Sequence, residues 1–205
     1  MTGGSTAVIC CGAIARELVR IRKLNNWSHV DIHCLPAGLH NTPEQIPCEV
    51  HRRAVELKDR YNSLFVAYAE CGTGGKLDAV LSDLGIERLP GAHCYQFLAG
   101  SEKFKQLTAA EPGSFYVTDF LVRHFERLVI RGLGLDKNLE LVDFCFARYH
   151  RLVHLAQSRS EHLQSSANAC ARRLGLEYHY EYCGDGPLSQ ALEPVLAGRT
   201  RLAVE

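Results

Sequence analysis

Short runs of apolar residues alternate along this chain with longer stretches in which apolar positions recur every three or four residues. A continuous apolar run such as Ala7–Cys11 is typical of a strand buried on both faces of a parallel sheet. Similar patterns predict further strands at residues 30–35, 63–70, 87–89, 114–118 and 177–182. Amphipathic periodicity predicts helices at residues 13–24, 43–61, 93–107, 120–133, 139–157, 161–174 and 188–196, and one ending near residue 84.

Strands that alternate with helices indicate parallel β-α-β units. They predict an α/β fold with a mostly parallel sheet and helices on both faces. No linker rich in Pro, Ser or Gly divides the chain, and 205 residues fit a single hydrophobic core. We therefore predict one α/β domain over residues 1–205. An arrangement in two lobes that share a cleft is compatible with this prediction.

The charge balance narrows the classes of partner. Lys and Arg number 23 and so do Asp and Glu, so no net field would attract nucleic acid or an anionic membrane surface. No apolar run approaches the roughly 20 residues that a membrane helix needs. Residues 1–6 are uncharged and Gly-rich, without the basic region and cleavage site of a signal peptide. We expect a cytoplasmic protein.

The chain contains nine cysteines but no Cys-x-x-Cys pair, so neither a zinc ribbon nor a zinc finger is indicated. In a reducing compartment they should be thiols. Free cysteine is a common small core residue, and we expect this role where a cysteine lies inside an apolar strand or helix pattern. Those residues are Cys10, Cys34, Cys48, Cys145 and Cys170.

The other cysteines lie in turns at the carboxyl ends of predicted strands, where open parallel sheets bind ligands. Cys11 ends a predicted strand, Cys71 and Cys183 each follow one, and Cys94 lies just past the short strand at residues 87–89. A helix N-terminus also favours the thiolate, the form that binds metals. We predict that Cys11, Cys71 and Cys94 converge on an iron–sulfur cluster or, alternatively, a zinc ion. The fourth ligand would be His93, Cys183 or an exogenous group.

The turn Cys71-Gly72-Thr73-Gly74-Gly75 has three interpretations that the sequence leaves open. It is a thiol site, a tight turn that needs positive φ, or a set of backbone N–H groups that binds a small anion with help from Lys76. It matches neither the P-loop nor the dinucleotide fingerprint. The cofactor-binding candidates are Gly12, Gly72, Thr73, Gly74, Gly75 and His93.

Three other histidines occupy positions to be compared with those of metal ligands. His40 lies in a loop at the carboxyl end of a strand, so it is as good a ligand candidate as His93. His150 and His154 are four residues apart on the helix predicted at residues 139–157. Their spacing suits a metal, but no zinc-protease pattern accompanies it, and we interpret them as a mixed, half-exposed face.

Four unusual motifs occur in order: Cys11-Gly12 with Arg16-Glu17, the Leu35–Pro43 loop (Leu-Pro-x-x-Leu-His-Asn-x-Pro), the Cys71–Gly75 turn, and Gly91-Ala92-His93-Cys94-Tyr95. Through them the chain, to about residue 157, resembles an uncharacterised prokaryotic family of about this length. The resemblance implies association with corrinoid-dependent methyl transfer, beside methyltransferases and the activators that re-reduce cobalt. The corrinoid-binding Asp-x-His-x-x-Gly motif is absent, so the chain is not expected to carry the cobamide itself.

Three functions follow from these patterns taken together with what the resemblance implies. The first is a metal or iron–sulfur protein that supports a corrinoid protein or methyltransferase in methyl transfer or reactivation. The second is an enzyme that uses a cluster-bound or free cysteine on a small anionic substrate. The third is a phosphate- or anion-binding module with incidental cysteines. The sequence does not decide whether the protein is an enzyme, and metal analysis of the purified protein would separate the first two functions from the third.

Overall fold

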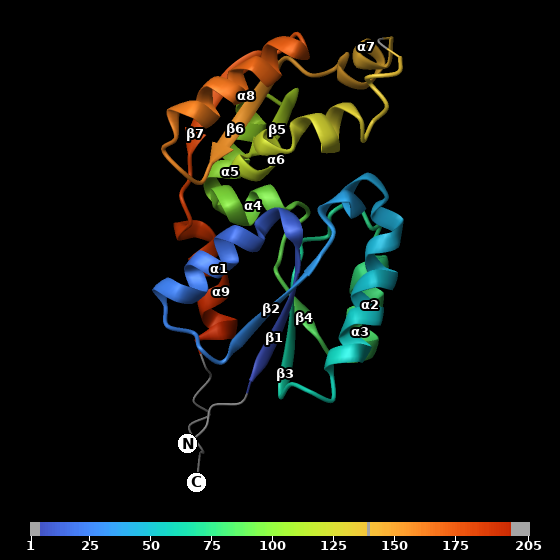
Figure 1. Cartoon of the computed structure of the whole chain (residues 1–205), viewed down its shortest axis with the longest axis vertical. Helices are drawn as coiled ribbons and strands as arrows, with labels where there is room; N and C mark the ends of the chain where they lie inside the picture. Colours follow the sequence, from blue (N-terminus) through green and yellow to red (C-terminus); the bar gives the residue numbers. More distant parts are fainter. Residues whose placement is uncertain (1–4, 139, 198–205) are drawn as a thin grey trace. The chain divides into compact units, whose positions relative to one another are not determined.

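The computed structural model describes residues 5–138 and 140–197. They fall into two compact units, each with a parallel sheet of its own. Unit 1 contains the chain up to Phe97 together with the segment from Gly186, and unit 2 is Leu98–Asp185. The predicted α/β class is therefore confirmed, with all paired strands parallel and helices around both sheets (Figure 1). One domain over residues 1–205, and a cleft shared by two lobes, stay predictions.

The sheet of unit 1 has the order β2-β1-β3-β4. Its strands are β1 (Thr6–Cys11), β2 (Val30–Leu35), β3 (Ser63–Ala67) and β4 (Glu87–Arg88). Strand β1 lies between two partners, and its residues from Ala7 to Cys10 are completely buried. Burial on both faces explains why β1 is an uninterrupted apolar run in the sequence.

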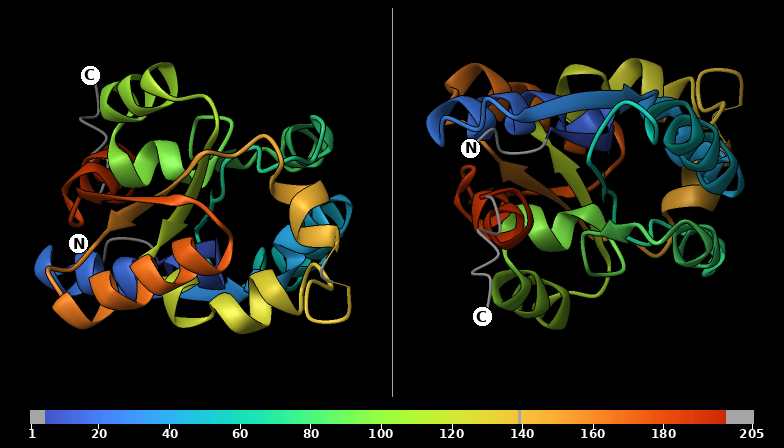
Figure 2. Two further views of the ribbon diagram at one scale, coloured as in Figure 1. Left: turned by 90° about the horizontal axis from the view of Figure 1, so that it is seen from above. Right: turned by 90° about the horizontal axis from the view of Figure 1, so that it is seen from below.

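Helices cover the sheet of unit 1 on both faces (Figures 1 and 2). Helices α1 (Ala15–Leu24) and α9 (Gly186–Leu196) lie on one face, and α2 (Ile46–Leu57) and α3 (Lys76–Leu84) on the other. Val8 and Ile32 of the sheet line a small apolar space with Leu18 of α1 and Leu192 of α9. Short 3-10 turns connect the strands to the helices: η1 (Gly12–Ile14), η2 (Ala37–Asn41) and η3 (Pro43–Gln45). Helix α4 (Cys94–Ala99) runs across the boundary to unit 2.

Unit 2 has the strand order β5-β6-β7. Its strands are β5 (Ser114–Thr118), β6 (Arg151–Ala156) and β7 (Glu177–Tyr182), and its helices are α5 (Ser101–Ala110), α6 (Asp119–Arg123), the π-helix η4 (Glu126–Ile130), α7 (Glu140–Phe146) and α8 (Glu161–Arg173). Val117 and Leu152 of the sheet pack with Leu163 and Ala167 of α8 in one apolar core. Thr118 accepts a hydrogen bond from the backbone N–H of Leu121 and so caps α6.

The predicted helix at residues 139–157 is wrong. Helix α7 ends at Phe146, and residues 151–156 form the central strand β6, which pairs with both of its neighbours. Leu152 to Ala156 are completely buried. A short run buried on both sides has no period that separates strand from helix, so the sequence pattern was ambiguous here. His150 and His154 therefore do not share a helix face.

Two other predicted helices are interrupted. The stretch at residues 93–107 divides at Gly100, whose φ of 86° is unfavourable for other residues, into α4 and α5. The stretch at residues 120–133 divides into α6 and the π-helix. No helix within residues 5–138 and 140–197 is long and apolar enough to cross a membrane.

Candidate metal site

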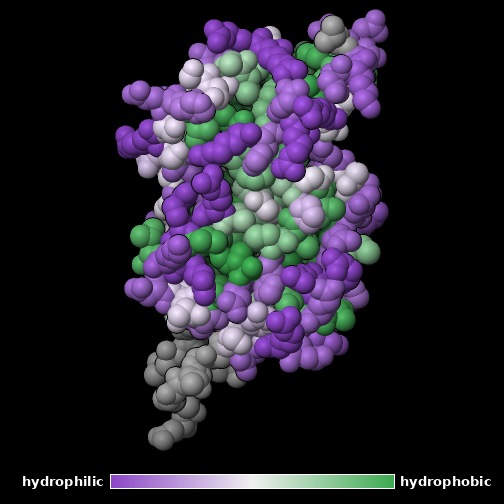
Figure 3. Space-filling model, in the orientation of Figure 1, coloured by the Kyte–Doolittle hydropathy of each residue, from purple (hydrophilic) through white to green (hydrophobic). Residues whose placement is uncertain are grey.

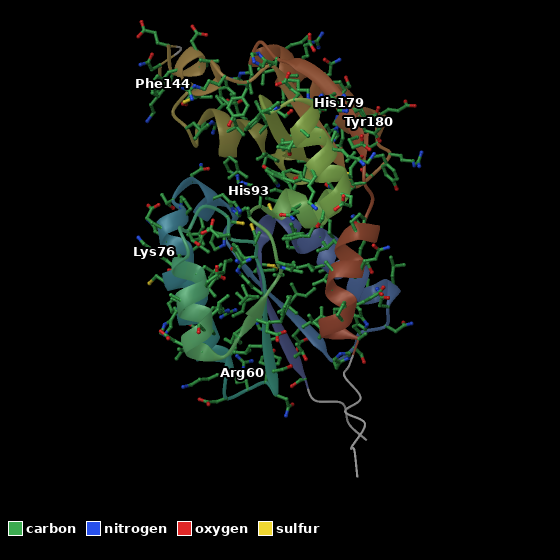
Figure 4. All side chains as sticks on the ribbon, turned by 180° about the vertical axis from the view of Figure 1, so that it is seen from behind. Arg60, Lys76, His93, Phe144, His179 and Tyr180 are labelled. Atoms are coloured by element: carbon green, nitrogen blue, oxygen red, sulfur yellow. The ribbon has the colours of Figure 1, made fainter. Side chains whose placement is uncertain are left out.

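The four strands of unit 1 run parallel, so the segments that follow their carboxyl ends emerge at one edge of the sheet. Cys11 is the last residue of β1, and His40 lies in η2 after β2. Cys71 follows β3, and Cys94 begins α4 after β4. Each of the four connections thus contributes one side chain capable of binding a metal, and Figure 4 shows sulfur atoms gathered close to the labelled His93 at this edge.

Three of these side chains form a compact group. One donor atom from each of His40, Cys71 and Cys94 lies within 4.8 Å of the other two. Cys11 lies beside the group, with its Sγ atom 3.6 Å from Nδ1 of His40. The same sulfur accepts a hydrogen bond from the backbone N–H of Ala13 at 3.3 Å, so Cys11 also caps η1. Cys71 and Cys94 of the predicted ligand set thus lie in the compact group. The third member of that group is His40, and Cys11 lies next to it.

Backbone hydrogen bonds hold the two cysteine turns together. Glu70 and Cys71 donate their N–H groups to the carbonyls of Gly91 and Ala92, at 3.0 and 2.9 Å. Cys71 has a φ of 54°, in the left-handed region that residues other than glycine seldom adopt. Such a conformation is retained where the surroundings impose it, and it occurs often at functional sites. This turn fixes the direction in which the Cys71 side chain leaves the backbone.

A close approach of two other connections explains Gly12. A Cβ atom at this position would lie only 3.0 Å from the carbonyl oxygen of Leu35. Glycine therefore allows the turn after β1 to pass against the turn after β2, which leads to His40. This close approach is a structural reason for glycine at position 12. The assignment of Gly12 to cofactor binding stays a prediction.

The electrostatics of the group favour a thiolate beside a charged imidazole. The hydrogen bond from Cys94 and the neighbouring His40 lower the pKa of Cys71 to about 5, although burial opposes the shift. The hydrogen bond to Cys71, together with burial, raises the pKa of Cys94. Burial disfavours the charged form of His40, but the neighbouring sulfurs of Cys11 and Cys71 outweigh this and raise its pKa to about 10. The cluster thus carries a preformed thiolate at neutral pH.

Two polar atoms at this edge are buried without a hydrogen-bond partner among the described residues: Nε2 of His40 and the hydroxyl oxygen of Tyr68. The Tyr68 side chain is almost completely buried, and its ring stacks on the His40 ring with centroids 6.2 Å apart. Buried polar groups are normally paired, so each such atom needs an explanation, and a bound ion is one of the usual ones.

The sequence model of a family described as a protein of unknown function (DUF1638) matches residues 34–191, which is more than half of the chain. The chain belongs to the DUF1638 family. His40, Cys71 and Cys94 lie inside the matched segment, and Cys11 precedes it. No curated protein matches the chain. The family description names no reaction, ligand or partner.

The Gly-rich turn of this DUF1638 chain already surrounds an anion, which is its own Glu70 carboxylate. Gly72 donates its N–H to Oε2 at 2.9 Å, while Gly75 and the Thr73 hydroxyl donate to Oε1 at 3.0 and 2.6 Å. These bonds, the one from Thr73 foremost, lower the pKa of Glu70 to about 2. The N–H groups of Gly72 and Gly75 are thus engaged within the turn, and an external anion would have to displace Glu70.

Two residues considered as a fourth ligand do not belong to the three-residue group. His93 is exposed, although the adjacent Cys94 is a member. Cys183 belongs to unit 2, where its thiol donates to the carbonyl of Glu181 at 3.6 Å. The sequence signal that would have selected His40 was available, because His40 follows a strand of the same parallel sheet. Nothing in the sequence ranked it above His93.

The five cysteines expected in the core divide into three kinds. Cys10 is completely buried, as expected. Cys145 and Cys170 are half-buried, in α7 and α8. The expectation was wrong for Cys34 and Cys48, which are exposed. Cys34 lies on β2, an edge strand of its sheet, where only one neighbour covers it, and a periodic pattern does not distinguish an edge strand from a central one.

Proposed function

We propose that this DUF1638 protein binds a single divalent metal ion that prefers sulfur and nitrogen, Zn²⁺ first, through His40, Cys71 and Cys94. The observation that supports this proposal best is the spacing of the three donor atoms, all within 4.8 Å of one another. Tetrahedral zinc, with bonds of about 2.3 Å to sulfur and about 2.0 Å to nitrogen, separates its donors by roughly 3.5 to 3.8 Å. The upper limit of 4.8 Å on the observed separations exceeds this spacing by only about 1 Å.

The same spacing ranks zinc above the iron–sulfur cluster that the sequence favoured. A cluster distributes its cysteine ligands over several iron atoms, so their sulfurs lie farther apart than in a mononuclear site. An imidazole beside two thiolates is also an ordinary donor set for zinc. A cluster therefore remains the alternative cofactor, to be tested by direct analysis of iron and sulfide.

We assign different roles to the two nitrogens of His40. Nε2 is buried and has no hydrogen-bond partner among the described residues, so it is the nitrogen we propose as metal donor. Nδ1 faces Cys11 at 3.6 Å. Cys11 would then accept a hydrogen bond from Nδ1–H and fix the tautomer and orientation of the ring, as groups behind metal-bound histidines commonly do.

Three protein donors leave the fourth tetrahedral position for an external ligand, which is the arrangement of catalytic rather than structural zinc sites. A metal ion held by His40, Cys71 and Cys94 would favour the thiolate form of a thiol bound to it, which is the nucleophilic form. The buried Tyr68 hydroxyl, which keeps its proton because burial raises its pKa, is available to donate a hydrogen bond to that ligand. We infer that the external ligand is a small thiol.

A thiol acceptor fits the context implied by the resemblance to corrinoid-associated proteins. In such a transfer the methyl group leaves cobalt for the sulfur of the thiolate, a carbon–sulfur bond forms, and cobalt keeps the electron pair of the broken bond. This protein would supply the activated thiol, and a corrinoid protein or methyltransferase would be its partner. The alternative of an anion-binding module is less favoured, because Glu70 occupies the Gly-rich turn.

The first experiment is metal analysis of the full chain after anaerobic purification. We expect about one zinc per chain and no acid-labile sulfide. His40→Ala, Cys71→Ser and Cys94→Ser should each lose the metal, because each removes one of three donors. Cys170→Ser is the matched control, since this half-buried cysteine lies in unit 2, and it should keep the metal. Full zinc content in Cys71→Ser, or iron with stoichiometric sulfide, would contradict the proposal.

The role of Cys11 is tested by substituting Co²⁺ for the metal, because the sulfur-to-cobalt absorption band grows with the number of bound thiolates. Cys11→Ser should leave this band unchanged while weakening affinity about 10- to 100-fold, as expected for a group behind a ligand. A proportional loss of the band would make Cys11 a ligand. Incubation of the zinc-loaded protein with a small thiol and methylcobalamin tests the methyl-transfer context separately, with Cys71→Ser as control.

A further inference from the structure

A second pair of thiols lies on the sheet of unit 1, outside the metal group. Cys10 of β1 and Cys34 of β2 are directly paired in the parallel register, and their sulfur atoms are 3.5 Å apart. Cys10 is completely buried, whereas Cys34 is exposed on the edge strand. Side chains alternate along a strand, so Cys10 projects to the face opposite that of Cys11, its neighbour in sequence. The pair is therefore separate from the three metal donors.

The backbone at this pair is compatible with a disulfide. Neighbouring strands lie about 4.8 Å apart, and disulfides join Cα atoms separated by about 4.4 to 6.8 Å. Paired residues in parallel strands project to the same face, as the contact between the two sulfurs shows. Shortening the distance from 3.5 Å to the roughly 2.05 Å of an S–S bond requires rotation of the side chains rather than a change of register.

We propose that Cys10 and Cys34 form a reversible oxidation site, in which Cys34 reacts with a hydroperoxide and Cys10 then closes an intramolecular disulfide. In the first step the Cys34 thiolate attacks one peroxide oxygen, the O–O bond breaks, and Cys34 becomes a sulfenic acid while the other oxygen leaves as an alcohol or water. In the second step the Cys10 sulfur displaces that hydroxyl from Cys34, and water leaves. The two thiols lose two electrons, which the peroxide gains.

The surroundings of the two sulfurs assign these roles. A peroxide reaches the exposed Cys34 and not the buried Cys10. The hydrogen bond from Cys10 lowers the pKa of Cys34 to about 7, against the opposing effect of burial, so much of Cys34 is thiolate at neutral pH. The hydrogen bond to Cys34 and burial raise the pKa of Cys10, so it stays a thiol until the sulfenic acid forms. A reactive exposed thiolate beside a second thiol is the arrangement typical of redox-sensing cysteines.

The test uses the full chain, reduced and purified anaerobically, and a small molar excess of hydrogen peroxide. Intact mass should fall by two hydrogen atoms, and dithiothreitol should restore it. Under non-reducing conditions, trypsin should release peptide 1–16, which contains Cys10, joined to peptide 24–52, which contains Cys34. Fragmentation assigns the bond within each peptide, because Cys11 and Cys48 are present in them as well. Cross-linking of the metal-site thiols Cys71 and Cys94 would join other peptides and is thereby distinguished.

Cysteine variants identify the two bonded residues independently of the tryptic peptide map. Cys34→Ser should abolish the joined peptides, whereas Cys48→Ser, the other exposed cysteine of the same peptide, should form them as the native chain does. Cys10→Ala should leave the sulfenic acid of Cys34 open to trapping by dimedone, which the native chain should resist. Joined peptides in Cys34→Ser, a bond assigned to Cys48 or Cys11, or dimedone labelling of native Cys34 would each overturn the proposal, whether or not Cys10→Ala folds.

Discussion

At the residue scale, the site combines one lowered and two raised pKa values. Cys71 has its pKa lowered to about 5 and is thiolate at pH 7, already the form that binds a metal. His40 has its pKa raised to about 10, so at pH 7 it carries a proton that a metal must displace. Cys94 has a raised pKa and also keeps its proton. Two of the three proposed donors are therefore protonated in the metal-free chain.

This imbalance predicts a steep pH dependence of metal affinity. Near pH 7, binding should release about two protons, one from His40 and one from Cys94, so affinity should rise roughly 100-fold per pH unit. The rise should slow as pH approaches 10 and the His40 proton is lost, and it should steepen below pH 5, where Cys71 takes up a proton. Competition with a chelator at pH 6, 7 and 8 measures the slope. A pH-independent affinity would show that the donors lie elsewhere.

At the scale of the element, the turn from Cys71 to Gly75 joins a strand end to α3 through positive φ angles at Gly72, Gly74 and Gly75. The repulsion among aligned N–H groups is relieved by the Glu70 carboxylate, which accepts three hydrogen bonds from the turn. Hydrogen bonds to a charged acceptor stabilise more than neutral ones. The turn that carries Cys71 is therefore built around Glu70.

We predict that Glu70→Gln destabilises the metal-free protein by about 1 kcal/mol at pH 7, since the amide group cannot accept the hydrogen bond from Gly72 and the site is half-exposed. The Glu70 pKa of about 2 lies below its unfolded value of about 4.3. Its stabilisation is thus complete above pH 4.3 and is lost as pH falls toward 2.

Urea unfolding of Glu70→Gln and of the native chain at pH 7 and at pH 3 tests this sign. The difference between them should shrink at the lower pH. Glu87→Gln, a change of an exposed carboxylate in β4, should have little effect at either pH. An equal difference at both pH values would mean that the Glu70 charge does not stabilise the turn.

At the scale of the whole molecule, the described residues form two units, each with its own parallel sheet. The space-filling view in Figure 3 shows apolar residues gathered over the strands of unit 1, flanked by hydrophilic residues on its helices. Cys11, His40, Cys71 and Cys94 all belong to unit 1. Unit 2 has its own apolar core, from Val117 to Leu176, around a different sheet. A metal ion bound by this group should therefore stabilise unit 1 directly.

We predict that zinc slows amide hydrogen exchange in the four connections of unit 1, at residues 11–14, 36–45, 68–75 and 90–95. A ligand at 100 times its dissociation constant stabilises the state that binds it by about 2.7 kcal/mol, and opening of these connections would have to release the metal. Peptides of β5, β6 and β7 should exchange at unchanged rates. Mass spectrometry with and without zinc gives the comparison, and equal protection of both units would contradict a site confined to unit 1.

The sequence by itself determined the α/β class, the parallel strands of unit 1 and the positions of Cys11, Cys71 and Cys94 after strands. These features follow from periods of two to four residues and from turn-forming glycines, which act over short stretches of chain. The limits of local patterns also explain two predictions that were wrong, the helix over residues 139–157 and the burial of Cys34. The buried run at residues 151–156 has no period that separates strand from helix, and Cys34 on β2 has the composition of a core strand although it lies at an edge.

Only the tertiary structure decided the division into two sheets, the order β2-β1-β3-β4 and the identity of the third member of the metal group. His40 meets Cys71 and Cys94 because β2 and β3 lie on either side of β1, a contact between residues more than 30 positions apart that no local pattern encodes. The same holds for the pairing of Cys10 with Cys34 and for the exposure of His93. Strand order and burial depend on how the whole chain excludes water from its apolar faces. Periodicity shows only which residues close in sequence lie on the same face of a helix or strand.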